Sequence, residues 1–227
     1  MAKTKVISAK EAAALVKDGM TVMVGGFMTN GTAETIIDAV KAAGSKDLTI
    51  ICNDAGFGPS DAEPCGVGVG KLLNNGQIKT LIASHVGLNK ECGTKYSAGE
   101  LELILQPQGT LAEQVRAGGN GLGGFLTPTG LGTTVAEGKE IITVDGNEYV
   151  LEKPLHADVA IVQGFVADES GNIRYKGSTR NFNILMASAA DTVIVEVEKI
   201  VPAGEIGPDY VETPHIYVDY LVLKEEA

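Results

Sequence analysis

Residues 20–52 read MTVMVGGFMTNGTAETIIDAVKAAGSKDLTIIC, and this stretch decides the fold class. It begins with an apolar, β-branched run that ends at a pair of glycines, which predicts a buried strand. Apolar residues at 36, 37, 40 and 43 then recur at helical spacing, with Thr32 as the expected N-cap and Gly44 as the stop signal. The run LTIIC at 48–52 predicts a second strand. The pattern is strand, helix, strand.

The same alternation continues along the chain. Apolar runs lie at 70–76, 78–84, 101–106, 158–164, 192–197 and 216–223, and a helical pattern covers 179–190. Repeated β and α elements with strands covered on both faces predict an α/β fold, an open and mostly parallel sheet flanked by helices. Asp145-Gly146 between alternating strands adds a small antiparallel ribbon. No repeat or linker interrupts the pattern, so we expect residues 1–227 to form a single domain.

Charge and hydropathy exclude two classes of partner. The formal net charge is −11, with 18 Lys and Arg against 29 Asp and Glu. A nucleic-acid binder neutralises phosphates with clustered basic residues, and no basic run occurs here. No apolar stretch approaches the roughly 20 residues that a membrane helix needs. We therefore expect neither nucleic acid nor membrane as a partner.

The cysteines and histidines do not predict a metal or redox site. Cys52, Cys65 and Cys92 are odd in number and lack the C-x-x-C spacing, and the three histidines are widely spaced. The N-terminal residues show no apolar secretion segment. We expect reduced thiols, no metal and a cytoplasmic location.

A glycine-rich stretch, PQGTLAEQVRAGGNGLGGFLTPTG at 107–130, is a candidate site. Glycine loses more conformational freedom on folding than other residues, so such a cluster costs stability unless backbone turns sharply or approaches something closely. No regular structure is expected in its glycine-dense part. Two further polar or glycine-rich loops follow strands, at 25–31 and 53–70. In open α/β sheets, ligands lie outside the carboxyl ends of the strands, where these loops gather.

One apparent nucleotide motif is rejected. Gly119, Gly121 and Gly124 have G-x-G-x-x-G spacing. A dinucleotide fingerprint follows a strand and opens a helix, whereas this one follows the helical segment LAEQVRA.

The chain resembles one known family nearly end to end. The resemblance rests on six segments that occur in the same order: GGF, NDAG, SAGELEL, PQGTLAEQVRAGG, FLTPTGLGT and STRNFNILMASAADTVIVEVE. The chain is similar to the alpha subunit of family I, or 3-oxoacid-type, CoA-transferases, the group that includes acetate and butyrate-acetoacetate CoA-transferases. Two departures are visible. Ala33 replaces a proline that usually follows the first glycine motif, and the stretch 57–66 is bulkier than usual.

The resemblance implies a covalent mechanism. In such enzymes a glutamate attacks the acyl-CoA thioester to give an acyl-glutamyl anhydride, and the CoA thiolate then forms a glutamyl-CoA thioester that the second acid resolves. The nucleophilic glutamate belongs to a motif of the beta subunit that this chain lacks. Glu34, Glu100 and Glu102 fit structural roles better. Coenzyme A is a substrate, and no cofactor is expected.

The resemblance also implies which residues form the site. Gln108 would donate its side-chain amide to the developing oxyanion, and Asn53 would lie near the reacting acyl group. Each has a simpler alternative, because a loop Gln can bond local backbone and an Asn after a strand can form an Asx-turn. Gly25 and Gly26 would let backbone approach the thioester, and Phe27 would shield it or simply join the core.

Gly118 and Gly119 would form part of the pocket wall, unless they serve folding alone. Arg116 and Arg180 could bind a substrate carboxylate, although arginine on a helix more often joins a surface ion pair.

The implied partner is a CoA-transferase beta subunit in a hetero-oligomer such as α2β2 or α4β4. Its substrates would be acyl-CoA and short-chain carboxylates such as acetate, butyrate or acetoacetate. A chain at −11 is poorly suited to hold CoA phosphates alone, so the partner should supply most CoA contacts. Three alternatives stay open: a dicarboxylate or 3-oxoadipate-type transferase subunit, a noncatalytic small-molecule sensor, and a hydrolase or transferase that acts alone.

Overall fold

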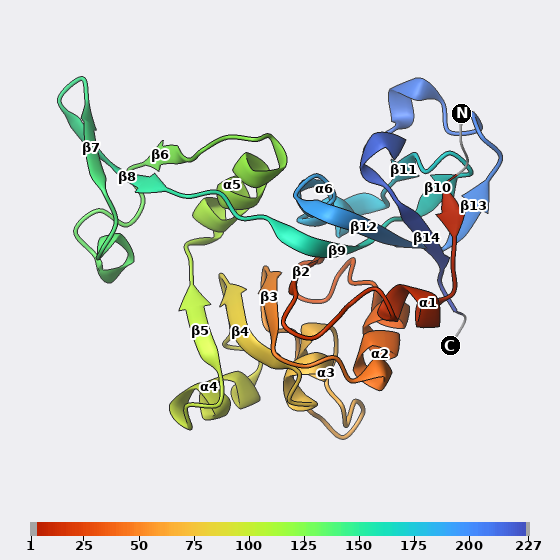
Figure 1. Ribbon diagram of the computed structural model, residues 1–227, viewed down its shortest axis with the longest axis horizontal. Coiled ribbons are helices and arrows are strands. Elements are labelled where there is room, and N and C mark those ends of the chain that lie inside the picture. The colour runs from red at the N-terminus through yellow and green to blue at the C-terminus, as the bar shows by residue number, and fades with distance from the viewer. Residues whose placement is uncertain (1–3, 226–227) are drawn as a thin grey trace.

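The computed structural model describes residues 4–225 and contains one large parallel sheet (Figure 1). Its eight strands run in the order β1-β14-β12-β9-β2-β3-β4-β5, and every neighbouring pair is parallel. In chain order they are β1 Lys5–Val6, β2 Thr21–Val24, β3 Leu48–Cys52, β4 Ile78–Ala83, β5 Glu102–Leu105, β9 Ala157–Gln163, β12 Ala190–Val197 and β14 Tyr220–Leu223.

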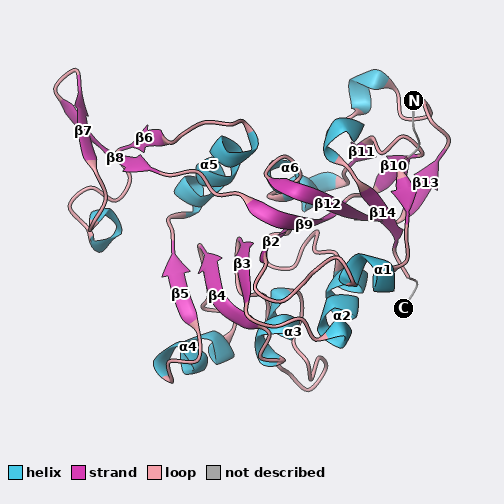
Figure 2. Cartoon of the chain, in the orientation of Figure 1, coloured by secondary structure: helices cyan, strands magenta, loops and turns pink. Residues whose placement is uncertain are grey.

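Helices cover both faces of this sheet, which explains why its central strands are largely apolar. Helices α1 to α4 lie on one face and α5 and α6 on the other (Figures 1 and 2), each over its own buried cluster. In β3, Ile50 joins the first cluster and Ile51 the second. The helices are α1 Ala9–Ala13, α2 Glu34–Ala43, α3 Val69–Asn74, α4 Lys90–Ser97, α5 Gln108–Gly119 and α6 Asn183–Met186. The predicted α/β architecture is confirmed.

Two small sheets complete the fold. The predicted ribbon forms at Asp145-Gly146, where both residues have positive φ as a two-residue hairpin requires. It extends away from the body of the molecule (Figure 1). This sheet contains β6 Phe125–Thr127, β7 Ile141–Val144 and β8 Asn147–Glu152, and the other contains β10 Val166–Asp168, β11 Ile173–Arg174 and β13 Lys199–Val201. Short 3-10 helices are η1 Thr134–Ala136, η2 Gly177–Arg180, η3 Pro208–Tyr210 and η4 His215–Tyr217.

Three local predictions are wrong. The N-cap of α2 is Ala33, because the Thr32 hydroxyl instead donates to the carbonyl of Gly25 at 3.3 Å. The helix expected at 179–190 shrinks to α6, because the backbone at Asn181 is not helical and separates α6 from the preceding 3-10 turn. The last strand begins only at Tyr220, since a 3-10 turn follows Pro214.

The glycine-rich stretch differs from expectation as well. Helix α5 begins at Gln108 and continues through Gly118 and Gly119, so regular structure does form over part of the run.

The order of strands places a switch point between β2 and β9. From β2 the chain winds outward through β3, β4 and β5, and then returns to β9 on the other side of β2. The carboxyl ends of these strands therefore border the crevice where ligands bind in open α/β sheets. Within residues 4–225, no helix is long and apolar enough to cross a bilayer.

Candidate active site

Polar residues from three loops meet at the carboxyl edge of the sheet. Asn53 and Asp54 follow β3, Ser84 follows β4, and Gln108 begins α5 just after β5. Because β3, β4 and β5 are parallel neighbours, these residues leave the sheet at the same edge. The site is a direct consequence of the strand order.

Gln108 and Asn53, which were predicted as separate candidates, are in contact. Gln108 Nε2 donates to Asn53 Oδ1 at 2.7 Å. The Ser84 hydroxyl lies 2.8 Å from the carbonyl oxygen of Asn53 and 3.2 Å from Oδ1. Asn53 is only 2% exposed, whereas Gln108 is exposed. A buried amide therefore holds an exposed one at the surface of the site.

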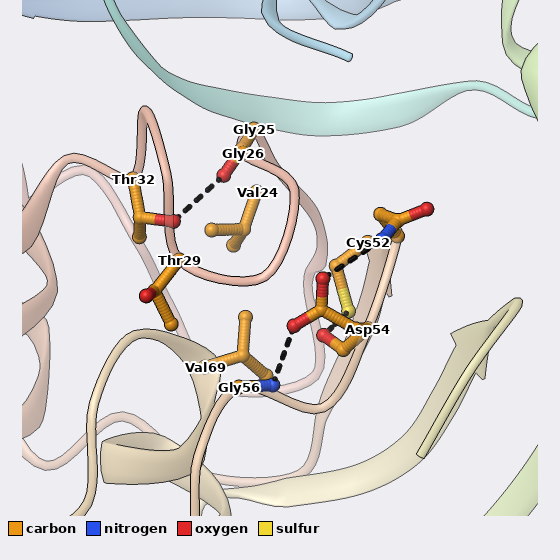
Figure 3. Close-up of a pocket in the computed structure, with 10 residues that line it drawn as sticks. Val24, Gly25, Gly26, Thr29, Thr32, Cys52, Asp54, Gly56 and Val69 are labelled. Carbon is orange, nitrogen blue, oxygen red and sulfur yellow. Dashed lines mark hydrogen bonds between the residues drawn. The ribbon is translucent and has the colours of Figure 1, made fainter. Parts of the chain in front are cut away.

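Asp54 joins the loop after β3 to the loop after β2. Its Oδ2 accepts from Asn53 Nδ2 at 2.8 Å and from the backbone N–H of Met28 at 2.7 Å, and its Oδ1 accepts from Gly56 N–H at 3.0 Å. Figure 3 shows this carboxylate pointing under the loop of Gly25, Gly26 and Thr29. Sequence reasoning missed Asp54, although the sequence shows a carboxylate two residues after the end of a buried strand.

The loop after β2 forms a tight, strained turn. Phe27 and Asn30 exchange two backbone hydrogen bonds, of 3.1 and 3.0 Å, around Met28 and Thr29. Both central residues have positive φ, 48° and 64°, which is uncommon for residues other than glycine. Phe27 is 39% and Met28 44% exposed. The turn thus presents two apolar side chains to the surface beside the amide pair.

Gly25 and Gly26 are required by packing and by backbone geometry. A Cβ on Gly25 would overlap Asn183 Oδ1, and Gly26 has a φ of 115°. Asn183 is fully buried; its Oδ1 accepts from Gln163 N–H at 2.9 Å, and its Nδ2 donates to the carbonyls of Gly31 and Thr179, both at 2.8 Å. Sequence reasoning missed Asn183, because no local pattern marks a residue that bonds a loop about 150 positions away.

A small cavity lies beneath the turn (Figure 3). Its volume is about 10 Å³, which is room for about one water molecule. Polar atoms of Thr29, Thr32 and Asp54 and the Cys52 thiol are among its lining groups. Burial raises the pKa of Cys52 well above its ordinary value, so this thiol stays protonated. The cavity is too small for an acyl group, and a substrate must bind above it.

Gly118 and Gly119 do not meet Gln108. They lie at the opposite end of α5, about 16 Å away at 1.5 Å per residue. A Cβ on Gly118 would overlap the carbonyl oxygen of Leu155, and one on Gly119 would meet Ser188. Close packing of the helix accounts for both glycines without a ligand.

The two candidate arginines form ion pairs with carboxylates. Arg116 Nε lies 2.8 Å from Glu113 Oε2, and Arg180 lies 3.5 Å from Glu212. All four side chains are partly exposed. These are the surface pairs that the simpler alternative predicts.

The glutamates considered as nucleophiles have structural partners. Glu34 pairs with Lys71 at 2.8 Å, Glu100 lies 3.7 Å from Lys95, and Glu102 accepts from the Thr80 hydroxyl at 2.8 Å. In the described part of the chain, no three His, Cys, Asp or Glu side chains gather into a group that could hold a metal ion.

This arrangement is an α/β fold with an exposed amide side chain and an apolar turn at the carboxyl edge of its sheet. Comparison with known proteins identifies the family. The family model for Coenzyme A transferase matches residues 6–224, and the chain belongs to that family.

Two relatives match over nearly the whole length. The chain is 45% identical over 225 residues to the acetate CoA-transferase subunit alpha of Escherichia coli, and the match covers 99% of both chains. It is 48% identical over 224 residues to the acetoacetyl-CoA:acetate/butyrate CoA transferase alpha subunit of Clostridium acetobutylicum, again over 99% of both.

A solved structure supports the fold. An acyl-CoA transferase of Escherichia coli, in a thioester complex with CoA, superposes with a TM-score of 0.83 at 22% identity over 97% of this chain and 47% of that one.

Proposed function

We propose that this chain is the alpha subunit of a transferase that moves CoA from a short-chain acyl-CoA to a carboxylic acid, with acetate, butyrate and acetoacetate as substrates. The support is its similarity to alpha subunits whose names specify these acids. The observation that carries a role for this chain in the chemistry is the Gln108–Asn53 contact of 2.7 Å at the carboxyl edge of the sheet.

In this proposal Gln108 stabilises the oxyanion. Its amide carries two hydrogens, and Asn53 Oδ1 accepts one. In this proposal the other hydrogen donates to the oxyanion, since Gln108 is an exposed residue. When a glutamate of the beta subunit attacks the thioester carbonyl, the carbonyl oxygen gains negative charge, which this N–H stabilises until the C–S bond breaks and CoA thiolate leaves. A neutral amide does this without changing its own protonation.

The remaining steps reuse the same donor. The thiolate attacks the glutamyl carbonyl of the anhydride, which releases the first carboxylate and leaves a glutamyl-CoA thioester. The acceptor carboxylate then attacks this thioester, and the CoA thiolate, released again, attacks the acyl carbonyl of the new anhydride. Each attack passes through an oxyanion. Water would hydrolyse either intermediate, and in this proposal the exposed side chains of Phe27 and Met28 exclude it.

The exposure of Gln108, Phe27 and Met28 favours a site that a beta subunit completes. We propose a hetero-oligomer such as α2β2 or α4β4, with most CoA phosphate contacts in the partner. Cys52, Cys65 and Cys92 are unpaired, as reducing conditions require, and we place the enzyme in the cytoplasm.

Co-expression with a CoA-transferase beta subunit tests the proposal. The assembly should transfer CoA from butyryl-CoA and acetoacetyl-CoA to acetate, and each chain alone should not. Ligand binding without exchange would instead favour a sensor. Turnover of acyl-CoA by the isolated chain would favour a hydrolase or self-sufficient transferase.

A series of acceptors separates the transferase types. A dicarboxylate enzyme needs an extra cationic group, and Arg116 and Arg180 are both paired with carboxylates. We therefore expect acetate and butyrate to be better acceptors than succinate or longer dicarboxylates. The reverse order would favour the dicarboxylate or 3-oxoadipate type.

A further inference from the structure

Asp54 lies at the junction of the two features that the proposed function uses. Asp54 accepts a hydrogen bond from the side chain of Asn53, the residue that also bonds Gln108. It accepts another from the backbone N–H of Met28 in the apolar turn. Asp54 is 7% exposed and follows a strand that is buried on both faces. The core thus fixes the position of Asp54, and Asp54 in turn fixes the Asn53–Gln108 amide pair and the turn at Met28.

The hydrogen bonds that link Asp54, Asn53 and Gln108 allow only one orientation of the two amide groups. A carboxylate accepts hydrogen bonds and cannot donate them, so the Asn53 group that faces Asp54 is the NH2 group. The Asn53 oxygen must then face Gln108. Since that oxygen only accepts, the Gln108 group at 2.7 Å is also an NH2 group. The carboxylate therefore decides that Gln108 presents N–H, rather than C=O, at the site.

We propose that Asp54 is a positioning residue for the reaction: it fixes the direction of the Asn53 and Gln108 amides and, through Met28, the adjoining turn. Without it, Asn53 is free to rotate by half a turn, and its NH2 group then faces Gln108. Gln108 responds by presenting its oxygen to Asn53, and its second N–H is no longer held toward the oxyanion. A displacement of about 1 Å at a reacting centre can cost on the order of 100-fold in rate.

Two substitutions at Asp54 have different expected effects. Asp54→Ala removes all three acceptor contacts. Asp54→Asn keeps one oxygen, which at the position of Oδ2 still accepts from Asn53 Nδ2 and Met28 N–H and loses only the Gly56 contact. The Asn53 and Gln108 amides then keep the orientation that they have in the wild type. Asp54→Asn should therefore largely keep the orientation of the Asn53 and Gln108 amides and of the turn at Met28, and Asp54→Ala should lose it.

Asp168 provides a matched control. It is 1% exposed, and it too accepts from an asparagine side chain, Asn172 Nδ2 at 2.9 Å, and from backbone N–H groups, those of Ser170 and Asn172 at 3.0 Å. It lies in the β10–β11–β13 sheet, far from the carboxyl ends of β3 to β5 (Figure 1). Asp168→Ala removes the same kinds of contact and leaves the amide pair untouched.

The first measurement needs no activity. In the 15N-labelled chain, the side-chain NH2 resonances of Asn53 and Gln108 are assigned by Asn53→Ala and Gln108→Ala. Asp54→Ala should shift both pairs and speed their exchange with solvent, Asp54→Asn should shift Gln108 little, and Asp168→Ala should leave both in place. An unchanged Gln108 pair in Asp54→Ala would overturn the proposal. If Asp54→Ala does not fold, Asp54→Ser removes the same planar acceptor.

The second measurement rests on the proposed function. In assemblies with the beta subunit, Asp54→Ala should lower kcat about 10- to 100-fold with little change in KM. Asp168→Ala should turn over nearly as wild type, and Asp54→Asn should lose much less kcat than Asp54→Ala. Equal kcat in Asp54→Ala and Asp168→Ala would also overturn the proposal. If the wild-type assembly transfers no CoA, the proposed function fails, and the resonances alone decide the role of Asp54.

Discussion

Glu196, inside the parallel sheet, caps a helix through a bond to Ile36, which lies 160 residues earlier in the chain. Its Oε2 accepts from the backbone N–H of Ile36 at 3.0 Å, in the first turn of α2. Helix N-termini leave such N–H groups without partners and favour negative charge. Thr32, the local candidate for this task, bonds Gly25 instead. A distant carboxylate therefore replaces the cap that the sequence predicts.

Glu196 makes stability depend on pH. It is fully buried, and burial raises its pKa to about 7, against the opposing effects of the Ile36 hydrogen bond and Lys224. The folded state therefore holds a proton between about pH 4.5 and 7 that the unfolded state has released, so stability falls as the pH rises through this range. We expect a decrease of about 1–3 kcal/mol in the free energy of unfolding.

Glu196→Gln should remove this component, because the amide oxygen still accepts from Ile36 and never ionises. The variant should melt several degrees above wild type at pH 8 and close to it at pH 5. Thermal melts across this range provide the measurement. Parallel curves for the two proteins would mean that Glu196 does not titrate as its burial indicates.

Two helical glycines should respond oppositely to alanine. A Cβ on Gly118 would overlap the Leu155 carbonyl, so Gly118→Ala should destabilise the chain by several kcal/mol. Gly93, inside α4, has open space around it, so Gly93→Ala should stabilise by about 0.5–1 kcal/mol. Denaturant titration of both variants measures the difference. Comparable stabilities would contradict the packing of α5 against Leu155.

Phe27 should matter for the fate of the intermediates. Phe27→Ala opens the turn to water, and the ratio of acyl-CoA hydrolysis to CoA transfer should rise in the assembled enzyme. Tyr96→Ala serves as the control, since Tyr96 is 56% exposed on α4, at the end that leads to the amino end of β5. Both products can be followed in one reaction. An unchanged ratio in Phe27→Ala would assign Phe27 to the core or to subunit contact.

The parallel sheet could be predicted from the sequence, because strands that are buried on both faces appear as continuous apolar runs. The run at 48–52 became β3 with the same bounds, and Asp145-Gly146 formed its hairpin. That residues 1–227 form a single domain stays a prediction. Local rules failed where the partner is distant. Thr32 instead bonds Gly25 in its own loop, and no spacing rule could find Asn183 or Glu196, whose partners Gly31 and Ile36 lie about 150 and 160 positions away.

The candidate site residues stay predictions, which rest on their positions after strands and on resemblance. The contact between two of them could be predicted from neither. Gln108 and Asn53 each follow a strand, but only the parallel order of β3, β4 and β5 shows that they meet. The role of Gly118 and Gly119 in the pocket wall stays a prediction, and their packing gives a second reason for glycine at these positions. A glycine that admits a ligand and one that admits a neighbouring carbonyl look alike in sequence, and Gly118 is of the second kind.

The central claim is that this chain supplies an amide donor to a reaction whose nucleophile comes from another subunit. The most direct measurement is the turnover of Gln108→Ala and Gln108→Glu in the assembly with the beta subunit, with CoA transfer from butyryl-CoA to acetate as the readout. Both variants lack the donor, and Gln108→Glu keeps the shape of the side chain. We predict a 100- to 1,000-fold lower kcat in both, on the order of that for loss of one oxyanion donor, with assembly and KM little changed. Wild-type turnover in either variant would contradict the claim.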